Sequence, residues 1–309
     1  MNIIILGAAG FIGTNLALAL ARDKKNKIVL VDQSIEYFNQ CLSDYSNITR
    51  VASTFNKSTD FSKLLEGQDC VYHLVSTNIP SNSGKNISEE LEANIIVTSK
   101  LLDACVEQGV KKVIFMSSGG TVYGKRMECP LKEDLPTYPI NSYGLQKITI
   151  EKLLYMYNYM YNLDYRVIRL ANPFGPYQRP NGKLGAVTTF TYKAIKNEPI
   201  TLYGDGSVVR DFIYIDDAVN AILTIADGED YNKVFNVGSG KGTSIKELLN
   251  LIEDTLQTEL IIHQCEGRKA DVPENYLDIS RYESRYGTLN KHSLREGILL
   301  TKKFLEEHY

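Results

Sequence analysis

A glycine-rich turn near the N-terminus constrains the fold of this chain more than any other feature. The aliphatic run Asn2–Leu6 leads directly into Gly7-Ala8-Ala9-Gly10-Phe11-Ile12-Gly13, and an alanine-rich segment then predicts a helix over 14–22. The run is typical of a fully buried parallel strand. Glycines between such a strand and a helix permit a tight turn, the close approach of a phosphate and close helix–strand packing. The helix N-terminus offers free N–H groups and a positive dipole end to a pyrophosphate.

A carboxylate follows the second predicted strand. Residues 27–31 form that strand, and Asp32 comes next, 19 residues after Gly13. A ribose-binding carboxylate is expected ~20 residues after the glycine turn. Strand, turn, helix, strand and acid in this order therefore predict a dinucleotide site. Asp32 would repel a 2′-phosphate, which favours NAD over NADP. A glycine turn that binds no ligand is the alternative.

Strands and helices continue to alternate up to residue 172. Further strands are expected at 48–52, 70–74, 112–116 and 166–170, with helices at 60–66, 88–108 and 142–161. Such alternation predicts an α/β fold with a doubly wound parallel sheet. Ligands bind beyond the carboxyl ends of the strands in these sheets. The polar residues Ser76, Ser117, Ser118 and Asn172 lie at such ends.

The regular alternation of strands and helices ends after Asn172. Prolines and glycines over 173–182 predict a loop, followed by a helix at 184–196, a strand at 199–203 and a turn at 204–207. Residues 210–226 read as a strand that runs into a helix, and 234–237 as another strand. A helix at 244–255, an extended segment at 260–263 and a charged amphipathic helix from Ser293 complete the expected elements.

The segment 141–147 places Tyr143 four residues before Lys147, at the start of a tyrosine-rich helical run. Positions i and i+4 share one face of a helix. A free phenol has a pKa of about 10, and a fixed positive charge nearby favours the phenolate. Tyr143 could then act as a base near neutral pH. The same pair also fits a surface helix, and only the strand-end residues and the dinucleotide site favour a functional role.

Composition excludes other classes of function. The net charge of −3 and the pI near 5.9 give no electrostatic case for nucleic acid or an anionic membrane. No apolar run approaches the length of a membrane span, and the N-terminus lacks the basic leader of a signal peptide. The five cysteines form no C-x-x-C pair and the four histidines are isolated. We therefore expect reduced thiols, a cytoplasmic protein and no metal site.

These motifs together resemble the extended short-chain dehydrogenase/reductase superfamily, in particular its nucleotide-sugar epimerase/dehydratase group. The landmarks are the turn at 7–13, Asp32, Asn94, Ser117-Ser118, Tyr123-Gly124, Tyr143 with Lys147, the segment 169–176, Arg210-Asp211-Phe212, and Arg268 with Asp271. The resemblance covers nearly the whole chain. It implies a Rossmann-type NAD-binding domain, over 1–172 and about 209–238. A smaller C-terminal α/β domain, over 173–208 and 239–309, would bind the nucleotide-sugar substrate.

The resemblance also implies residue roles. Tyr143 would be the catalytic base and acid, Lys147 would hold the nicotinamide ribose and lower the pKa of Tyr143, and Ser117 or Ser118 would contact the reacting oxygen. The implied cofactor-binding set is Gly7, Gly10, Phe11, Ile12, Gly13, Asp32, Gln33, Leu74, Ser76, Asn94, Ser117, Tyr143, Lys147 and Pro173. The implied substrate-binding set is Ser118, Thr121, Tyr143, Asn172, Tyr203, Arg210, Arg268, Asp271 and Asn275.

Two positions depart from the family pattern. The usual catalytic Ser or Thr, four residues before the tyrosine of the Tyr-Gly pair, is Gly119 here. A hydroxyl must then come from Ser117, Ser118 or Thr121. The acid that usually follows the third strand and meets the adenine corresponds to Thr54, so 53–55 would hold the adenine through other contacts.

The resemblance narrows the reaction. Dehydratases and decarboxylases of the family carry a carboxylate after the catalytic Ser/Thr position, whereas this chain has Gly119-Gly120-Thr121. With dehydration and decarboxylation set aside, the reaction left is reversible oxidation at one carbinol. This reaction predicts 4-epimerisation of a UDP-hexose through a 4-keto intermediate. A nucleotide keto-sugar reductase using NAD(P) and a cofactor-binding regulator without turnover are the alternatives. The family often forms homodimers, which we expect here.

The residue that gates space for an N-acetyl group in such epimerases corresponds to Asn275 when counted back from Asp278. A small residue at this position predicts room for an acetamido group. A shift of the alignment by one residue would place Tyr276 there and reverse the conclusion.

Overall fold

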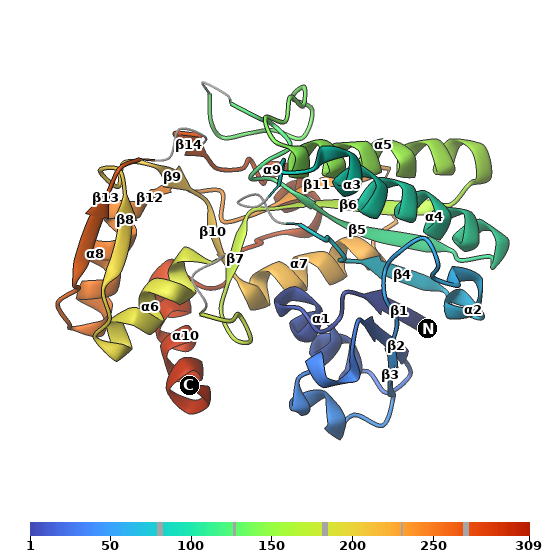
Figure 1. Cartoon of the computed structure of the whole chain (residues 1–309), viewed down its shortest axis with the longest axis horizontal. Coiled ribbons are helices and arrows are strands. Elements are labelled where there is room, and N and C mark those ends of the chain that lie inside the picture. The colour runs from blue at the N-terminus through green and yellow to red at the C-terminus, as the bar shows by residue number, and fades with distance from the viewer. Residues whose placement is uncertain (79–82, 126–127, 181–184, 230, 268–271) are drawn as a thin grey trace.

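A seven-stranded parallel sheet forms the centre of the molecule (Figure 1). The structure, a computed structural model, describes residues 1–78, 83–125, 128–180, 185–229, 231–267 and 272–309. The strand order is β11-β6-β5-β4-β1-β2-β3, and every neighbouring pair is parallel. The strands are β1 (Asn2–Leu6), β2 (Lys27–Asp32), β3 (Ile48–Ala52), β4 (Cys70–His73), β5 (Lys112–Ser118), β6 (Asp164–Leu170) and β11 (Val234–Val237). The predicted doubly wound Rossmann-type sheet is confirmed.

Alternating side chains of each strand face two separate hydrophobic clusters. Ile3 and Ile5 of β1 lie in one cluster, while Ile4 and Leu6 lie in the other. Both faces are buried, which explains why these strands read as continuous aliphatic runs. Helices α1 (Phe11–Ala21) and α7 (Ile215–Asp227) cover one face. Helices α2 (Phe61–Leu65), α4 (Val97–Glu107) and α5 (Ser142–Tyr161) cover the other (Figure 1).

Most of the remaining elements gather beside one end of the sheet (Figure 1). Helices α6 (Ala186–Lys196), α8 (Ile245–Leu256) and α10 (Leu294–His308) pack on one another, and β8 (Ile200–Tyr203) pairs with β13 (Ile262–Cys265). A three-stranded sheet joins β12 (Thr243–Ser244), β9 (Val209–Arg210) and β14 (Glu274–Asn275). Helix α9 (Ser280–Tyr286) packs on β11.

Two predicted segments differ from the observed elements, and two observed turns were not predicted. The loop expected after Asn172 begins with strand β7 (Asn172–Phe174), which pairs with β10 (Phe212–Tyr214). This pairing joins segments about forty residues apart, so no local pattern reveals it. The helix expected over 88–108 is divided into α3 (Ile87–Leu91), a π-helical turn η3 (Glu92–Ile96) and α4. Two short 3₁₀ turns, η1 (Ile35–Tyr37) and η2 (Gln40–Asp44), were not predicted.

Within the described residues, no helix has the length and apolar character needed to cross a bilayer.

Candidate active site

The glycine turn between β1 and α1 is held by the end of β2. The N–H groups of Gly7 and Ala8 both donate to the Val31 carbonyl, at 2.9 and 3.1 Å. Gly7 has φ +82°, which a residue with a Cβ adopts only at a cost. A Cβ on Gly13 would lie 2.6 Å from the Gly7 carbonyl oxygen. Glycine at 13 therefore lets the helix start directly against the turn.

Asp32 is fixed at the carboxyl end of β2 by two backbone donors. The N–H of Ala9 donates to its Oδ2 at 2.9 Å, and the N–H of Gln33 donates to its Oδ1 at 2.8 Å. One carboxylate thus ties the glycine turn to the second strand. Its remaining lone pairs are available to the vicinal hydroxyls of a ribose.

A cleft of about 560 Å³ opens beside this turn. Seven residues of the predicted cofactor set line it, namely Gly7, Gly10, Phe11, Asp32, Gln33, Leu74 and Ser76. Ser53, Thr54 and Phe55, where the adenine was expected, line it too. This combination of small turn residues, one carboxylate and apolar walls fits the adenosine and pyrophosphate half of a dinucleotide.

Tyr177, Gln178 and Arg179 are among the lining residues that sequence reasoning missed, together with Tyr37, Thr59, Phe61 and Leu64. Tyr177 has φ +67°, so the loop after β7 turns sharply at this position. The Asn15 side chain of α1 donates to the Pro176 carbonyl at 3.0 Å and holds the loop over the turn. The proline and glycine content of 173–182 indicated a loop, but nothing local placed it against the cleft.

Tyr143 and Lys147 lie on the first turns of α5, which Asn141 caps by accepting the Gly144 N–H at 2.8 Å. The Lys147 Nζ donates to the Met116 carbonyl of β5 at 2.8 Å. The same ammonium lies 5.5 Å from the centroid of the Tyr143 ring. The helix and the strand end thus bring the two predicted catalytic residues together.

The pKa of the phenol differs from the expectation. Burial raises the pKa of Tyr143 to about 12. Burial also lowers the pKa of Lys147 to about 8, while the Glu151 carboxylate acts in the opposite direction. The expected lowering of the Tyr143 pKa is absent in this structure, where the ammonium donates to a backbone carbonyl and lies over the face of the ring. Tyr143 is therefore a phenol here at neutral pH.

The three candidate hydroxyls have different surroundings. The Ser117 Oγ donates to the buried Glu151 Oε1 at 2.5 Å, so this hydroxyl is already engaged away from a substrate. Ser118 is half-buried at the end of β5. The Thr121 Oγ1 is buried and makes no hydrogen bond within the described part of the chain. The Thr121 carbonyl lies against Gly144, the residue that follows Tyr143.

The side chain of Leu277 fills the space beside Gly119. A Cβ on Gly119 would lie 2.5 Å from one methyl carbon of Leu277, so the leucine occupies the space of a side chain at 119. The Asn275 side chain donates to the Gly119 carbonyl at 3.4 Å, whereas the Tyr276 ring packs near Gly242. Asn275, and not Tyr276, therefore faces the end of β5.

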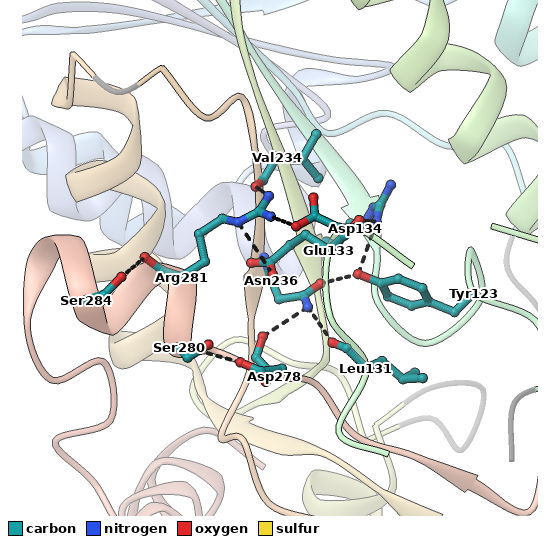
Figure 2. A network of polar contacts seen from close by, with 11 residues as sticks. Tyr123, Leu131, Glu133, Asp134, Val234, Asn236, Asp278, Ser280, Arg281 and Ser284 are labelled. Atoms are coloured by element: carbon teal, nitrogen blue, oxygen red, sulfur yellow. Dashed lines mark hydrogen bonds and ion pairs between the residues drawn. The ribbon is translucent and has the colours of Figure 1, made fainter. Parts of the chain in front are cut away.

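A buried polar network holds the segment that carries Asn275 and Leu277 (Figure 2). The Asn236 amide of β11 donates to the Leu131 carbonyl at 2.7 Å and to the Asp278 carbonyl at 3.0 Å. It accepts from the Tyr123 hydroxyl at 2.6 Å, and its backbone N–H donates to Glu133 at 3.0 Å (Figure 2). Every polar group of Asn236 named here has a partner, so the segment is fixed against the sheet.

Asn94 and Asn172 both hold backbone in place. The buried Asn94 of η3 accepts from the Thr77 N–H at 3.0 Å and donates to the Thr77 hydroxyl at 2.7 Å, so it orders the segment after β4. Such π-helical turns often lie at functional sites. The Asn172 side chain donates to the Asp211 carbonyl at 2.8 Å.

The remaining predicted residues are spread over the neighbouring elements. Ile12 lies in the first turn of α1, and Pro173 lies on β7. Arg210 on β9 donates to the Val272 carbonyl at 2.7 Å, and Tyr203 is exposed at the end of β8. Arg268 and Asp271 lie outside the described residues.

Comparison with known proteins places this geometry in a family. Residues 3–238 match the model of the NAD dependent epimerase/dehydratase family. A putative UDP-glucose 4-epimerase of Methanocaldococcus jannaschii is 30% identical, and the match covers 96% of this chain and 95% of the relative. A dTDP-4-dehydro-6-deoxyglucose reductase of Escherichia coli is 31% identical, over 96% of this chain and 95% of the relative.

Solved structures show the same fold. The UDP-glucose 4-epimerase of Thermotoga maritima, in complex with UDP-glucose, has a TM-score of 0.91 at 31% identity and covers 99% of both chains. The UDP-N-acetylglucosamine 4-epimerase of Methanobrevibacter ruminantium has a TM-score of 0.90 at 31% identity, with 100% of this chain and 99% of that chain covered. A UDP-glucuronic acid 4-epimerase variant of Bacillus cereus, solved with NAD, has a TM-score of 0.90 at 27% identity and covers 100% of both chains.

Proposed function

This chain belongs to the NAD-dependent epimerase/dehydratase family, and from that premise we propose that it interconverts the C4 epimers of a UDP-hexose. The observation that carries the proposal is the pair formed by half-buried Tyr143 and buried Lys147, beside a turn, Gly119-Gly120-Thr121, that has no carboxylate. Elimination at C5 and C6, or decarboxylation, would need an acid–base group at that turn. Proton exchange at a single carbinol needs only the phenol.

NAD, the cofactor of the family, supplies a hydride acceptor and later a hydride donor. Tyr143 takes the proton of the C4 hydroxyl as that carbon is oxidised, and it returns the proton after the 4-keto sugar has turned to present its other face. Lys147 supplies positive charge beside the phenol, which favours the phenolate. Burial acts in the opposite direction and raises the pKa of Tyr143 to about 12.

We assign the hydrogen bond to the reacting oxygen to Thr121. A buried hydroxyl without a partner is unfavourable, and a substrate oxygen would satisfy it. The other substrate-binding residues that the family resemblance implies, Arg210 among them, are part of the same proposal. So is the division into a cofactor domain, over 1–172 and about 209–238, and a substrate domain made of the rest.

Room for an N-acetyl group is supported by Asn275, which is buried and faces Gly119. We therefore propose UDP-glucose and UDP-galactose, together with their N-acetyl forms, as substrates. The test is to incubate purified protein with each UDP-sugar and to separate the epimers. Consumption of added NADPH with a keto-sugar, instead of epimerisation, would favour a reductase, the activity named for the E. coli relative.

Replacing Asn275 with tyrosine should lower kcat/KM for the N-acetylated pair by about tenfold or more relative to the unsubstituted pair, because the larger ring fills space beside Gly119. The epimer separation above measures both ratios. Tyr276→Phe is the control, since Tyr276 packs on the other side near Gly242. Equal losses for both pairs in Asn275→Tyr would contradict the assignment of Asn275 as the gate.

A homodimer is the predicted assembly, and the outer face of α5 supports it. Tyr155, Tyr159 and Met160 are 61%, 83% and 54% exposed, so this helix presents a large apolar surface. Sedimentation equilibrium of the wild-type chain should give twice the monomer mass, and Tyr159→Glu should shift the equilibrium toward the monomer. A monomeric wild-type protein at micromolar concentration would contradict this expectation.

A further inference from the structure

Glu151 is a buried carboxylate that the proposed reaction does not use. It lies on α5 one turn after Lys147, which itself lies one turn after Tyr143. All three side chains therefore share one face of the helix. Glu151 is 5% exposed and Lys147 is 4% exposed. A buried charge of this kind is costly unless it is paired, so the carboxylate must be held for a reason.

Two adjacent residues of β5 hold Lys147 and Glu151 in register. The Met116 carbonyl accepts from the Lys147 ammonium at 2.8 Å, and the Ser117 hydroxyl donates to the Glu151 Oε1 at 2.5 Å. The strand thus contacts two successive turns of α5 through consecutive residues. These two hydrogen bonds fix the position of α5 along β5. The site lies at the end of that strand.

Arg169 of β6 completes the arrangement around the carboxylate. Its Nε donates to Glu151 Oε1 at 3.1 Å, and its Nη2 donates to Oε2 at 2.7 Å. A fork of this kind leaves the carboxylate a single orientation. Arg169 also donates to the Tyr123 hydroxyl at 3.1 Å, and so connects α5 to the network around Asn236 (Figure 2).

The other groups described here that face Lys147 do not supply a negative charge in place of Glu151. His73 of β4 is buried and its pKa is lowered to about 3, so the imidazole is neutral at neutral pH. Tyr143 is a phenol in this structure, and the Phe115 ring of β5 lies 4.8 Å from the ammonium. Glu151 is the anion that acts on Lys147, against the desolvation that disfavours its charged form.

We propose that Glu151 is a positioning residue for Lys147, held by Ser117 and Arg169 so that the buried lysine stays charged beside Tyr143. In this arrangement Ser117 serves the helix and not the substrate, although the family resemblance implied a catalytic role. The inference rests on the proposed function only for the role of Lys147 in turnover. The placement of Glu151 next to Lys147 does not depend on turnover, because the two side chains share a face of α5 and are held by adjacent residues of β5.

The test compares Glu151→Gln with Glu133→Gln. Glu133 is also buried and hydrogen-bonded, and it lies in the network around Asn236, so the same change there is a matched control. Loss of a nearby negative charge destabilises the ammonium, so the pKa of Lys147 should fall by about one unit or more in Glu151→Gln. The alkaline limb of the kcat profile should move to lower pH by the same amount. Glu133→Gln should leave the limb in place.

A readout without turnover separates this inference from the proposed function. The ¹³Cε resonance of Lys147, assigned through its absence in Lys147→Arg, reports the lysine titration directly. A shifted titration in Glu151→Gln, in a protein without epimerase activity, would support the inference and overturn the proposed function. A folded Glu151→Gln with an unchanged titration would overturn the inference. If Glu151→Gln does not fold, Glu151→Asp is the alternative, because its shorter side chain withdraws the carboxylate from Lys147. It should shift the Lys147 titration in the same direction by a smaller amount. An unchanged titration in Glu151→Asp would overturn the inference.

Discussion

Replacing Tyr143 with phenylalanine should lower the interconversion of UDP-glucose and UDP-galactose by about 10²- to 10⁴-fold, the usual contribution of general acid–base catalysis. The phenol is the group that is placed to exchange a proton at C4, because it lies on α5 beside Lys147 and next to the turn at 119–121. Removing one oxygen leaves the ring packed against the lysine. Separation of the two epimers after timed incubation measures the effect.

The controls identify the step that is lost. Tyr155→Phe, on the exposed face of the same helix, should retain full activity. Tyr143→Phe should still bind NAD in a calorimetric titration, since the cleft beside Asp32 is unchanged. Thr121→Val, which keeps the base, should lower kcat by a smaller factor of about 10 to 100. Full epimerase activity in Tyr143→Phe would refute the mechanism.

Replacing Arg169 with methionine should reduce the free energy of unfolding by about 3–5 kcal/mol, because it leaves the buried Glu151 carboxylate without its partner. Arg169 is 4% exposed, and it also donates to the Glu133 carbonyl at 2.9 Å. The loss therefore combines an uncompensated charge with an unsatisfied carbonyl. Chemical denaturation followed by circular dichroism measures the change.

Arg295→Met is the matched control, because Arg295 pairs with Asp254 at the surface. Exposed pairs contribute at most about 1 kcal/mol. The double variant Arg169→Met/Glu151→Leu should be more stable than Arg169→Met alone, since it removes the stranded charge as well. An effect of Arg169→Met no larger than that of Arg295→Met would show that the buried pair does not stabilise the fold.

Local patterns in the sequence determined the α/β class, the parallel sheet and the NAD cofactor. The strand, the glycine turn and Asp32 lie within one short stretch, and each element follows from sterics and hydrogen bonding between near neighbours. The helix that carries Tyr143 and Lys147 was predicted with its observed bounds, Ser142–Tyr161. Residues that act through i and i+4 spacing need no tertiary information to be placed on one face.

The tertiary structure decided which hydroxyl is engaged by Glu151 and which side chain fills the space beside Gly119. Ser117 could be assigned to Glu151 only after β5 and α5 had packed together, because these residues are 34 positions apart. Leu277 comes from the far end of the chain to fill the space at Gly119, and the same packing turns Asn275 toward the site and Tyr276 away from it. Sequence patterns report periodicity within one element. Contacts between distant elements depend on how their side chains fill shared space, which no single stretch of sequence encodes.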